Sequence, residues 1–236
     1  MVIAGGSLTT AAHWVAYESL LFNDEESPFR ASMLAGAPRL LVVAGENASG
    51  KSLFSRMLCA RLHGTGLLPI SISIRERTGA GDSGMGGMRR VFMLGDESDQ
   101  STGATSVQVV RSGFRNVKQK KESTLLALDE PELGLSDGYA RAFGQYIGGQ
   151  ARETPKQCAG VVVVTHSRSL VAGLLGGYGE PPTFVLLDGD ADLQRWLATP
   201  EVRTVEQLLA LPELGLTRWR RINELSDQIK KHPTER

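Results

Sequence analysis

Cysteine is scarce in this sequence, and its scarcity excludes a fold stapled by disulfides. Only Cys59 and Cys158 occur among 236 residues, and two cysteines are too few for a disulfide framework. Their spacing does not match that of zinc ligands either. Because both lie in apolar segments, we expect two buried thiols.

Long apolar runs and an excess of charge are also absent. No segment approaches the roughly eighteen consecutive apolar residues that cross a membrane, although a peripheral role at a membrane surface stays open. Acidic residues such as Glu18 and Asp24 come too early for a secretory signal peptide, so we expect a cytoplasmic protein without a membrane span. Lysine and arginine together number 26, as do aspartate and glutamate. The chain therefore has no overall positive field for nucleic acid, and any such contact would be local.

Residues 40–52 contain a phosphate-binding motif. An apolar run over residues 40–44 predicts a buried strand, and it leads into Gly45-Glu46-Asn47-Ala48-Ser49-Gly50-Lys51-Ser52. This form, GxxxxGK[ST], lets a turn wrap around the phosphates of a nucleotide. Gly45 and Gly50 permit backbone angles that point N–H groups inward, and the positive end of the following helix adds to the attraction.

The residues after the loop strengthen this interpretation. Lys51 is expected to reach the β- and γ-phosphates, and Ser52 to offer its hydroxyl to Mg²⁺. Gly64 provides a helix stop, and before it apolar residues recur at helical spacing, namely Leu53, Phe54, Met57, Leu58 and Leu62. A strand before the loop and a helix after it make an ordinary glycine turn the weaker interpretation.

Acidic residues follow a second apolar segment. Residues 124–128 predict a buried strand that leads into Asp129-Glu130-Pro131-Glu132. In parallel α/β sheets, ligands bind at the carboxyl ends of the strands. We therefore expect Asp129 to hold the Mg²⁺ shell and Glu130 to polarise an attacking water.

A histidine stands at the end of a third buried strand. Residues 160–164 form an apolar, β-branched run that ends in Thr165-His166-Ser167. A lone histidine is more often a surface or capping residue than a catalytic one. Its place after a phosphate loop and an acidic strand end nevertheless favours contact between His166 and the γ-phosphate.

The motifs lie in the middle of three predicted segments. Residues 1–39 are expected to form a helical covering segment, residues 40–190 an α/β core with a mainly parallel sheet flanked by helices, and residues 191–236 a helical segment. Prolines at 200 and 212 are expected to break the last segment. Further strands are predicted at 67–74, 91–94 and 183–187, and further helices at 107–117 and 140–147.

Two groups of residues leave alternatives open. Aromatic side chains in the first segment either pack on the sheet or form a stacking platform for adenine; these are Trp14, Tyr17 and Phe29. Arginines flank a glycine-rich loop that either covers phosphates or is simply solvated; these are Arg75, Arg77, Arg89 and Arg90.

In the order of these motifs, residues 40–188 resemble the core of the ATP-binding cassette (ABC) ATPases, and most of all its soluble SMC-, RecF- and OLD-type branch. That branch serves DNA maintenance and phage defence. Asp129-Glu130-Pro131-Glu132-Leu133-Gly134-Leu135-Ser136 is similar to its Walker B strand and D-loop, and Val164-Thr165-His166-Ser167 to its switch-histidine loop. The resemblance implies a P-loop NTPase fold. Only 50 positions separate Lys51 from Ser101, so the helical subdomain of the family would be reduced.

The resemblance also implies a site shared between two chains. In the family, a signature containing serine and glycine closes over ATP held by another subunit. Here Ser101 and Gly103 stand at the expected place, which implies nucleotide contacts in trans. The sequence departs from the LSGGQ signature at Gln100, Thr102 and Ala104. The chain also has no clear glutamine loop, and Gln100, Asp96 or Glu97 are the candidates for its role.

We therefore expect an ATPase that binds MgATP, forms an ATP-dependent dimer with a second copy or a related subunit, and hydrolyses ATP to ADP and phosphate. One alternative is an ATP-gated regulatory or scaffold subunit that controls a partner effector and hydrolyses ATP slowly. A second is a P-loop kinase for a small metabolite with the arginine loop as a lid, which Glu130 and His166 fit poorly. A transporter subunit also fits poorly, because the short stretch before Ser101 leaves little room to dock a membrane domain.

Overall fold

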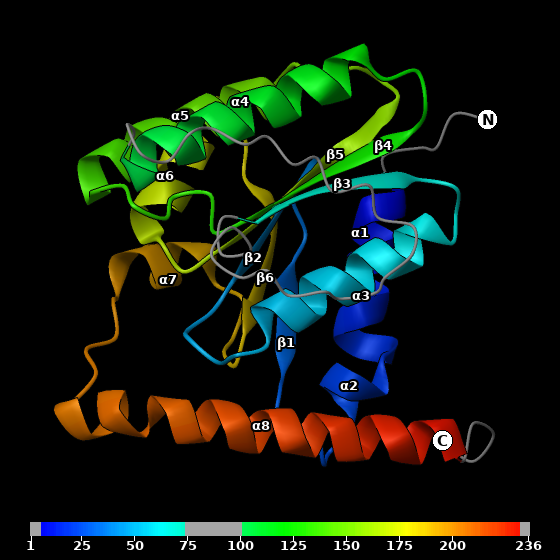
Figure 1. Ribbon diagram of the computed structural model, residues 1–236, viewed down its shortest axis with the longest axis vertical. Coiled ribbons are helices and arrows are strands. Elements are labelled where there is room, and N and C mark those ends of the chain that lie inside the picture. The colour runs from blue at the N-terminus through cyan, green and yellow to red at the C-terminus, as the bar shows by residue number, and fades with distance from the viewer. Residues whose placement is uncertain (1–5, 74–100, 232–236) are drawn as a thin grey trace.

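The computed structural model describes residues 6–73 and 101–231 (Figure 1). Several features singled out in the sequence therefore lie outside the described residues, namely the arginine-flanked loop, the strand predicted at 91–94, and Asp96, Glu97 and Gln100. Within the described ranges, no helix is both long and apolar enough to cross a membrane.

Helices and strands alternate along most of the described chain. The helices are α1 (Gly6–His13), the short π-helix η1 (Trp14–Glu18), α2 (Leu20–Asn23), α3 (Lys51–His63), α4 (Thr102–Gln119), α5 (Asp137–Arg152), α6 (Arg168–Tyr178), α7 (Leu193–Ala198) and α8 (Val205–Lys231). The strands are β1 (Ala31–Leu34), β2 (Ala37–Ala44), β3 (Leu68–Ser73), β4 (Thr124–Asp129), β5 (Cys158–Thr165) and β6 (Pro182–Leu187).

The six strands form one sheet in the order β1-β6-β2-β5-β4-β3. All neighbours are parallel except the edge strand β1, which pairs antiparallel with β6. The fold class is thus α/β with a mainly parallel sheet flanked by helices, as the sequence predicts. Strand β2 lies between β5 and β6, and β5 separates it from β4.

Helices cover both faces of the sheet and bury two apolar layers (Figure 1). Alternate residues of β2 point to opposite sides: Leu40 and Val42 join the layer under α4, α5, α6 and α7, whereas Leu41 and Val43 join the layer under α1, α2, α3 and α8. This accounts for the apolar strand sequences, because a strand buried on both faces has no polar side. Both cysteines are buried as predicted, and burial raises the pKa of the Cys59 thiol to about 11.

The helices α5 and α6 approach each other at glycine positions. A Cβ atom added at Gly173 of α6 would lie 2.0 Å from the carbonyl oxygen of Arg141 in α5, and one at Gly144 of α5 would lie 2.0 Å from the carbonyl oxygen of Leu170. Only glycine permits two helix backbones to lie this close. The two helices therefore pack tightly against each other over one face of the sheet.

Two local features differ from expectation. Residues 31–34 form strand β1 within a segment predicted to be helical. The sequence does not reveal this strand, because its partner β6 comes about 150 residues later and the pairing leaves no local pattern. Pro212 was expected to end a helix, but α8 continues through it. A proline removes one backbone hydrogen bond and costs roughly 3 kcal/mol, and the burial of Ile222 and Leu225 further along holds the helix in place.

The parallel strands all end at one edge of the sheet. Ala44 of β2 pairs with Thr165 of β5, and Val164 of β5 pairs with Asp129 of β4, so the three strands stop within one residue of each other. The loops that follow them carry the motifs found in the sequence. The candidate site is therefore at this carboxyl edge.

Candidate functional site

The loop after β2 has the backbone geometry that the glycine pattern predicts. Gly50 is the N-cap of α3 with φ of 92°, in the left-handed region that favours glycine. Its missing side chain also makes room for Phe29, whose ring carbons would lie 3.0 Å from a Cβ atom at this position. The loop thus delivers its backbone directly into the N-terminus of α3, where N–H groups without helical partners attract anions.

Lys51 lies inside this loop. Its Nζ donates hydrogen bonds to the carbonyl oxygens of Gly45 at 3.0 Å and Glu46 at 2.8 Å, and the residue is only 7% exposed. A buried ammonium group needs polar partners or an anion to offset its loss of hydration. The fold therefore holds one positive charge at the centre of the loop.

Ser49 contributes an unsatisfied polar atom. Its hydroxyl is buried and has no hydrogen-bond partner among the described residues, which is unusual because buried polar groups in proteins are nearly always hydrogen-bonded. A Cβ atom at Gly45 would lie 2.6 Å from this hydroxyl. The loop is thus packed around a donor that a bound anion would satisfy.

Backbone strain is concentrated at three strand ends. Among the described residues, the non-glycine residues with positive φ are Ala48 at 61°, Glu130 at 47° and Asp188 at 60°. They follow β2, β4 and β6 respectively. Each such conformation costs of order 1–3 kcal/mol and persists only where surrounding contacts enforce it, which is typical of functional sites.

Glu130 is held in its strained conformation by the adjacent strand. Its N–H donates to the carbonyl of Val164 at 2.9 Å, and its carbonyl accepts from Leu133 at 3.2 Å. Its side chain is buried, and Oε1 lies 3.4 Å from Nδ1 of His166, which is itself about half exposed. This contact raises the pKa of His166, against the effect of burial. The two residues form one acid–base pair.

A second carboxylate, Glu132, lies behind this pair. Its carboxylate accepts a short hydrogen bond from the hydroxyl of Thr165, which in turn accepts from the N–H of Ser167 at 2.8 Å. Burial raises the pKa of Glu132, and the hydrogen bond from Thr165 opposes that shift. Glu132 therefore fixes the loop after β5, from which His166 projects.

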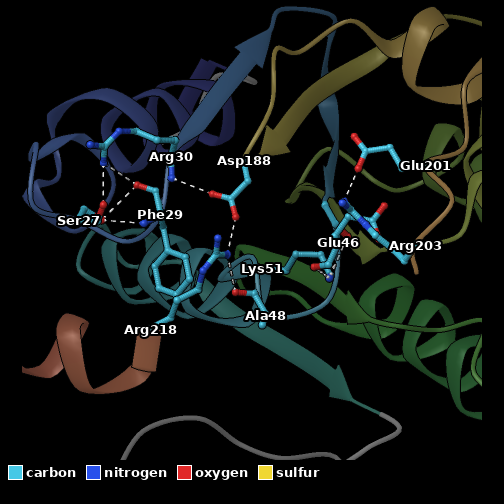
Figure 2. A network of polar contacts seen from close by, with 11 residues as sticks. Ser27, Phe29, Arg30, Glu46, Ala48, Lys51, Asp188, Glu201, Arg203 and Arg218 are labelled. Carbon is cyan, nitrogen blue, oxygen red and sulfur yellow. Dashed lines mark hydrogen bonds and ion pairs between the residues drawn. The ribbon is translucent and has the colours of Figure 1, made fainter. Parts of the chain in front are cut away.

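The C-terminal helix α8 contacts the phosphate loop through Arg218 (Figure 2). The guanidinium of Arg218 donates to the carbonyl of Ala48 at 3.0 Å and forms an ion pair with the carboxylate of Asp188 at 2.5 Å. It also lies over the ring of Phe29, 5.7 Å from the centroid. Asp188 is tied to the sheet by the N–H of Arg30 at 3.3 Å. Arg218 thus joins α8 to the loop and to the end of β6.

Two cavities open beside the loop. The smaller, of about 200 Å³, is lined by loop residues 47–52, by Glu130, and by Phe29, Gly215, Arg218 and Trp219 among others. The larger, of about 550 Å³, is lined by Gly45, Glu46 and Asn47 together with residues of the loop after β6 and of α8. Asn47 and Arg218 line both. The structure therefore brings Lys51, Ser52 and Glu130 to one cavity, whereas Asp129 and His166 line neither.

The predicted metal ligands, Ser52 and Asp129, carry oxygen donors suited to Mg²⁺. No group of three or more His, Cys, Asp and Glu side chains suited to a metal ion occurs within the described ranges. Mg²⁺, however, is usually held by one or two protein oxygens together with substrate phosphates and water. The hydroxyl of Ser52 and the carboxylate of Asp129 are donors of that kind.

Ser101 and Gly103 lie at the start of α4 and line neither cavity. Ser101 is exposed and caps the helix by accepting from the N–H of Ala104 at 3.4 Å. Gly103 is buried, and a Cβ atom there would lie 2.6 Å from the carbonyl oxygen of Gly134. In addition, the hydroxyl of Ser106 donates to the carbonyl of Leu133 at 2.9 Å. The start of α4 is therefore fixed to the segment that follows Glu130.

Three residues of the site were missed by sequence reasoning. Asp188 stands at a strand end, a position that could have suggested a role. Arg218 and Trp219 come from α8, about 170 residues after the loop that they approach, and no local pattern marks them.

Comparison with known proteins adds no assignment: no family model matches the chain, and no curated protein gives a significant match.

Proposed function

We propose that this chain is a P-loop ATPase of the ABC type that binds MgATP and hydrolyses it to ADP and phosphate. One observation carries the proposal. A single cavity is lined by the loop with Lys51 at its centre and by the strained, buried Glu130. A phosphate-binding loop facing a carboxylate is the arrangement needed to hold a terminal phosphate and to orient water against it.

Each candidate residue then has a role. The N–H groups of residues 45–50 and the ammonium of Lys51 bind the phosphates, and the orphan hydroxyl of Ser49 supplies a further donor. Ser52 and Asp129 hold Mg²⁺, which when bound neutralises phosphate charge. Glu130 orients the attacking water, and His166, paired with Glu130, senses the γ-phosphate. Almost all of the catalysis is positioning and electrostatics.

In this proposal the active form is an ATP-dependent dimer. Ser101 at the exposed N-terminus of α4 contacts ATP held by a second copy or a related subunit, and Gly103 allows α4 to lie against the segment after Glu130 in its own chain. Closure of one chain on the ATP of another would thereby be transmitted to Glu130. The resemblance of the motifs suggests a role in DNA maintenance or phage defence.

The proposal is tested by Lys51→Ala. We expect loss of MgATP binding in calorimetry and loss of phosphate release. The matched control is Lys156→Ala, because Lys156 is exposed and precedes β5 at the opposite edge of the sheet. Hydrolysis that is unchanged in Lys51→Ala would refute the site.

A second function is favoured by the surface of α8. The first half of this helix exposes apolar side chains, with Val205, Leu208 and Leu209 each more than 60% exposed. Exposed apolar clusters often mark interaction sites. An ATP-gated regulatory subunit would use such a surface to engage an effector protein. Copurification of a stoichiometric partner and very slow turnover would support this function, and full activity of the isolated chain would count against it.

A further inference from the structure

The smaller cavity is lined by two chemically different groups of residues. One group is polar and comes from the loop and β4, with Lys51, Ser52 and Glu130. The other combines aromatic rings and glycine from outside the loop, with Phe29, Gly215 and Trp219. A ligand that satisfies both groups carries phosphate at one part and a flat, apolar ring at another.

The aromatic candidates named in the sequence are already engaged in packing. Phe29 is only 6% exposed, since its ring lies against Gly50 and beneath the guanidinium of Arg218. The ring of Trp14 is covered by the guanidinium of Arg61 at 4.0 Å, and the hydroxyl of Tyr17 accepts from the N–H of Met33 at 2.8 Å. Neither Trp14 nor Tyr17 lines the cavity.

Trp219 differs from Phe29, Trp14 and Tyr17. It is 51% exposed and also lines the smaller cavity beside the loop. A half-exposed tryptophan at the wall of a polar cavity presents a large aromatic surface to whatever binds there.

The position of Trp219 is fixed by its neighbours on α8. Arg218 joins the helix to Ala48 and Asp188, as Figure 2 shows. Arg221 forms an ion pair with Glu26 at 3.0 Å, and Ile222 is buried in the core. Contacts of the residues before and after Trp219 therefore fix this part of α8 and hold Trp219 at the wall of the cavity.

We propose that Trp219 stacks on the base of the nucleotide whose phosphates bind the loop, so that α8 forms the nucleoside side of the site. This inference rests on the proposed function. The smaller cavity, of about 200 Å³, is below the roughly 300–1,000 Å³ typical of small-molecule sites, so a nucleotide held there extends beyond it. Trp219 lines this cavity and not the larger one, and its half-exposed indole offers a stacking surface to the base at the edge of the cavity.

Stacking also predicts the specificity of the site. An indole stacks on any base, because every base has a π face. Trp219 therefore contributes affinity for the nucleoside without choosing between ATP and GTP.

The test compares ligands with and without a base. We expect Trp219→Ala to weaken binding of ATP and GTP by a similar factor, roughly 5- to 100-fold, in calorimetric titrations. Inorganic tripolyphosphate, which has the phosphates but no base, should bind with unchanged affinity. Trp219→Phe should retain most of the affinity for ATP. The control is Leu216→Ala, because Leu216 is an exposed residue of α8 that lines neither cavity.

Each other outcome has a definite meaning. If the unchanged protein binds neither ATP nor tripolyphosphate, the proposed function itself fails. If Lys51→Ala abolishes ATP binding but Trp219→Ala does not weaken it, the ATPase proposal stands and the stacking inference falls. An equal loss of affinity for ATP and for tripolyphosphate in Trp219→Ala would mean that the substitution displaces α8. A change of oligomeric state with unchanged affinities would make Trp219 an interface residue. Either result would overturn the inference.

Discussion

Nδ1 of His166 lies 3.4 Å from Oε1 of Glu130, and the two residues follow neighbouring strands of the sheet. This distance means that the candidate base and the candidate phosphate sensor are not independent. A change in the charge or position of one acts directly on the other, and the following predictions begin from that coupling.

Glu130→Gln should stop hydrolysis while preserving nucleotide binding. The amide keeps the size of the side chain but cannot take up a proton from water, and loss of a general base typically lowers rates by about 10²- to 10⁴-fold. Phosphate release and calorimetry measure the two effects separately. Light scattering with MgATP should then show doubling of the mass, because the closed dimer accumulates.

The control for this variant is Glu180→Gln, since Glu180 is exposed and lies just before β6, at the opposite edge of the sheet. A mass that does not change with MgATP would leave the nucleotide site intact but remove the dimer. Normal turnover in Glu130→Gln would remove Glu130 from the mechanism.

The stability of the protein should fall as the pH rises through the neutral range. The pKa of His166 is raised above its ordinary value of 6.5 by Glu130, with Glu132 adding to the shift and burial and Lys51 opposing it. A histidine whose pKa is higher in the folded than in the unfolded protein stabilises the folded state. This stabilisation is complete below the pKa of the unfolded state and is lost as the pH rises through the pKa of the folded state. Because His166 is about half exposed, we expect a contribution of less than about 1 kcal/mol.

Urea unfolding at a series of pH values tests this dependence. In His166→Gln the part of the decline above pH 6.5 that comes from His166 should disappear. A decline that begins at lower pH should remain, because the pKa of Glu132 is also raised above its ordinary value of 4.5 and its contribution is lost as the pH rises through that raised pKa. Identical curves for the two proteins would show that the contact with Glu130 does not persist in solution.

Arg218 and Asp188 should be energetically coupled. Their ion pair is about three-quarters buried, so we expect a coupling energy near the upper end of the 0.2–1 kcal/mol range of surface pairs. A double-mutant cycle with Arg218→Ala and Asp188→Asn measures it by urea unfolding. Asparagine suits this test because it tolerates the left-handed backbone of residue 188. Strict additivity of the two changes would contradict the pairing.

Gly173→Ala should destabilise the fold strongly. The new methyl group would meet the carbonyl oxygen of Arg141 at 2.0 Å, and separating two packed helices should cost about 3 kcal/mol. Gly176→Ala is the matched control in the same helix, because nothing lies within 4 Å of its added Cβ atom. That substitution should be neutral or stabilising by up to about 1 kcal/mol. Thermal unfolding of both variants decides the matter, and equal melting temperatures would contradict close packing of α5 and α6.

The features predicted correctly from the sequence are those with a local signal. The glycines of the phosphate loop set their own backbone angles, and the helix after Lys51 ends at Gly64 as its pattern indicates. The apolar runs before Gly45, Asp129 and Thr165 are strands because burial on both faces leaves a continuous apolar sequence. Parallel pairing then places the ends of these strands at one edge.

The features that were missed depend on contacts distant in the sequence. Asp188 takes its role from Arg30 and Arg218, and Trp219 reaches the cavity only because α8 folds back over the loop. Such contacts leave no periodicity in the chain. Pro212 was misjudged for a related reason, because anchoring of the second half of α8 offsets the local cost of a proline.

The place of β2 in the sheet has a consequence for synthesis of the protein. This strand is translated early, yet both of its neighbours, β5 and β6, come more than a hundred residues later. At 5–20 residues per second, the ribosome needs on the order of 10 s to supply them. During that time the apolar strand that leads into the phosphate loop can pack against α1 and α3 but has neither of its neighbouring strands. Its backbone hydrogen-bonding groups therefore stay unpaired with a native strand until β5 and β6 emerge.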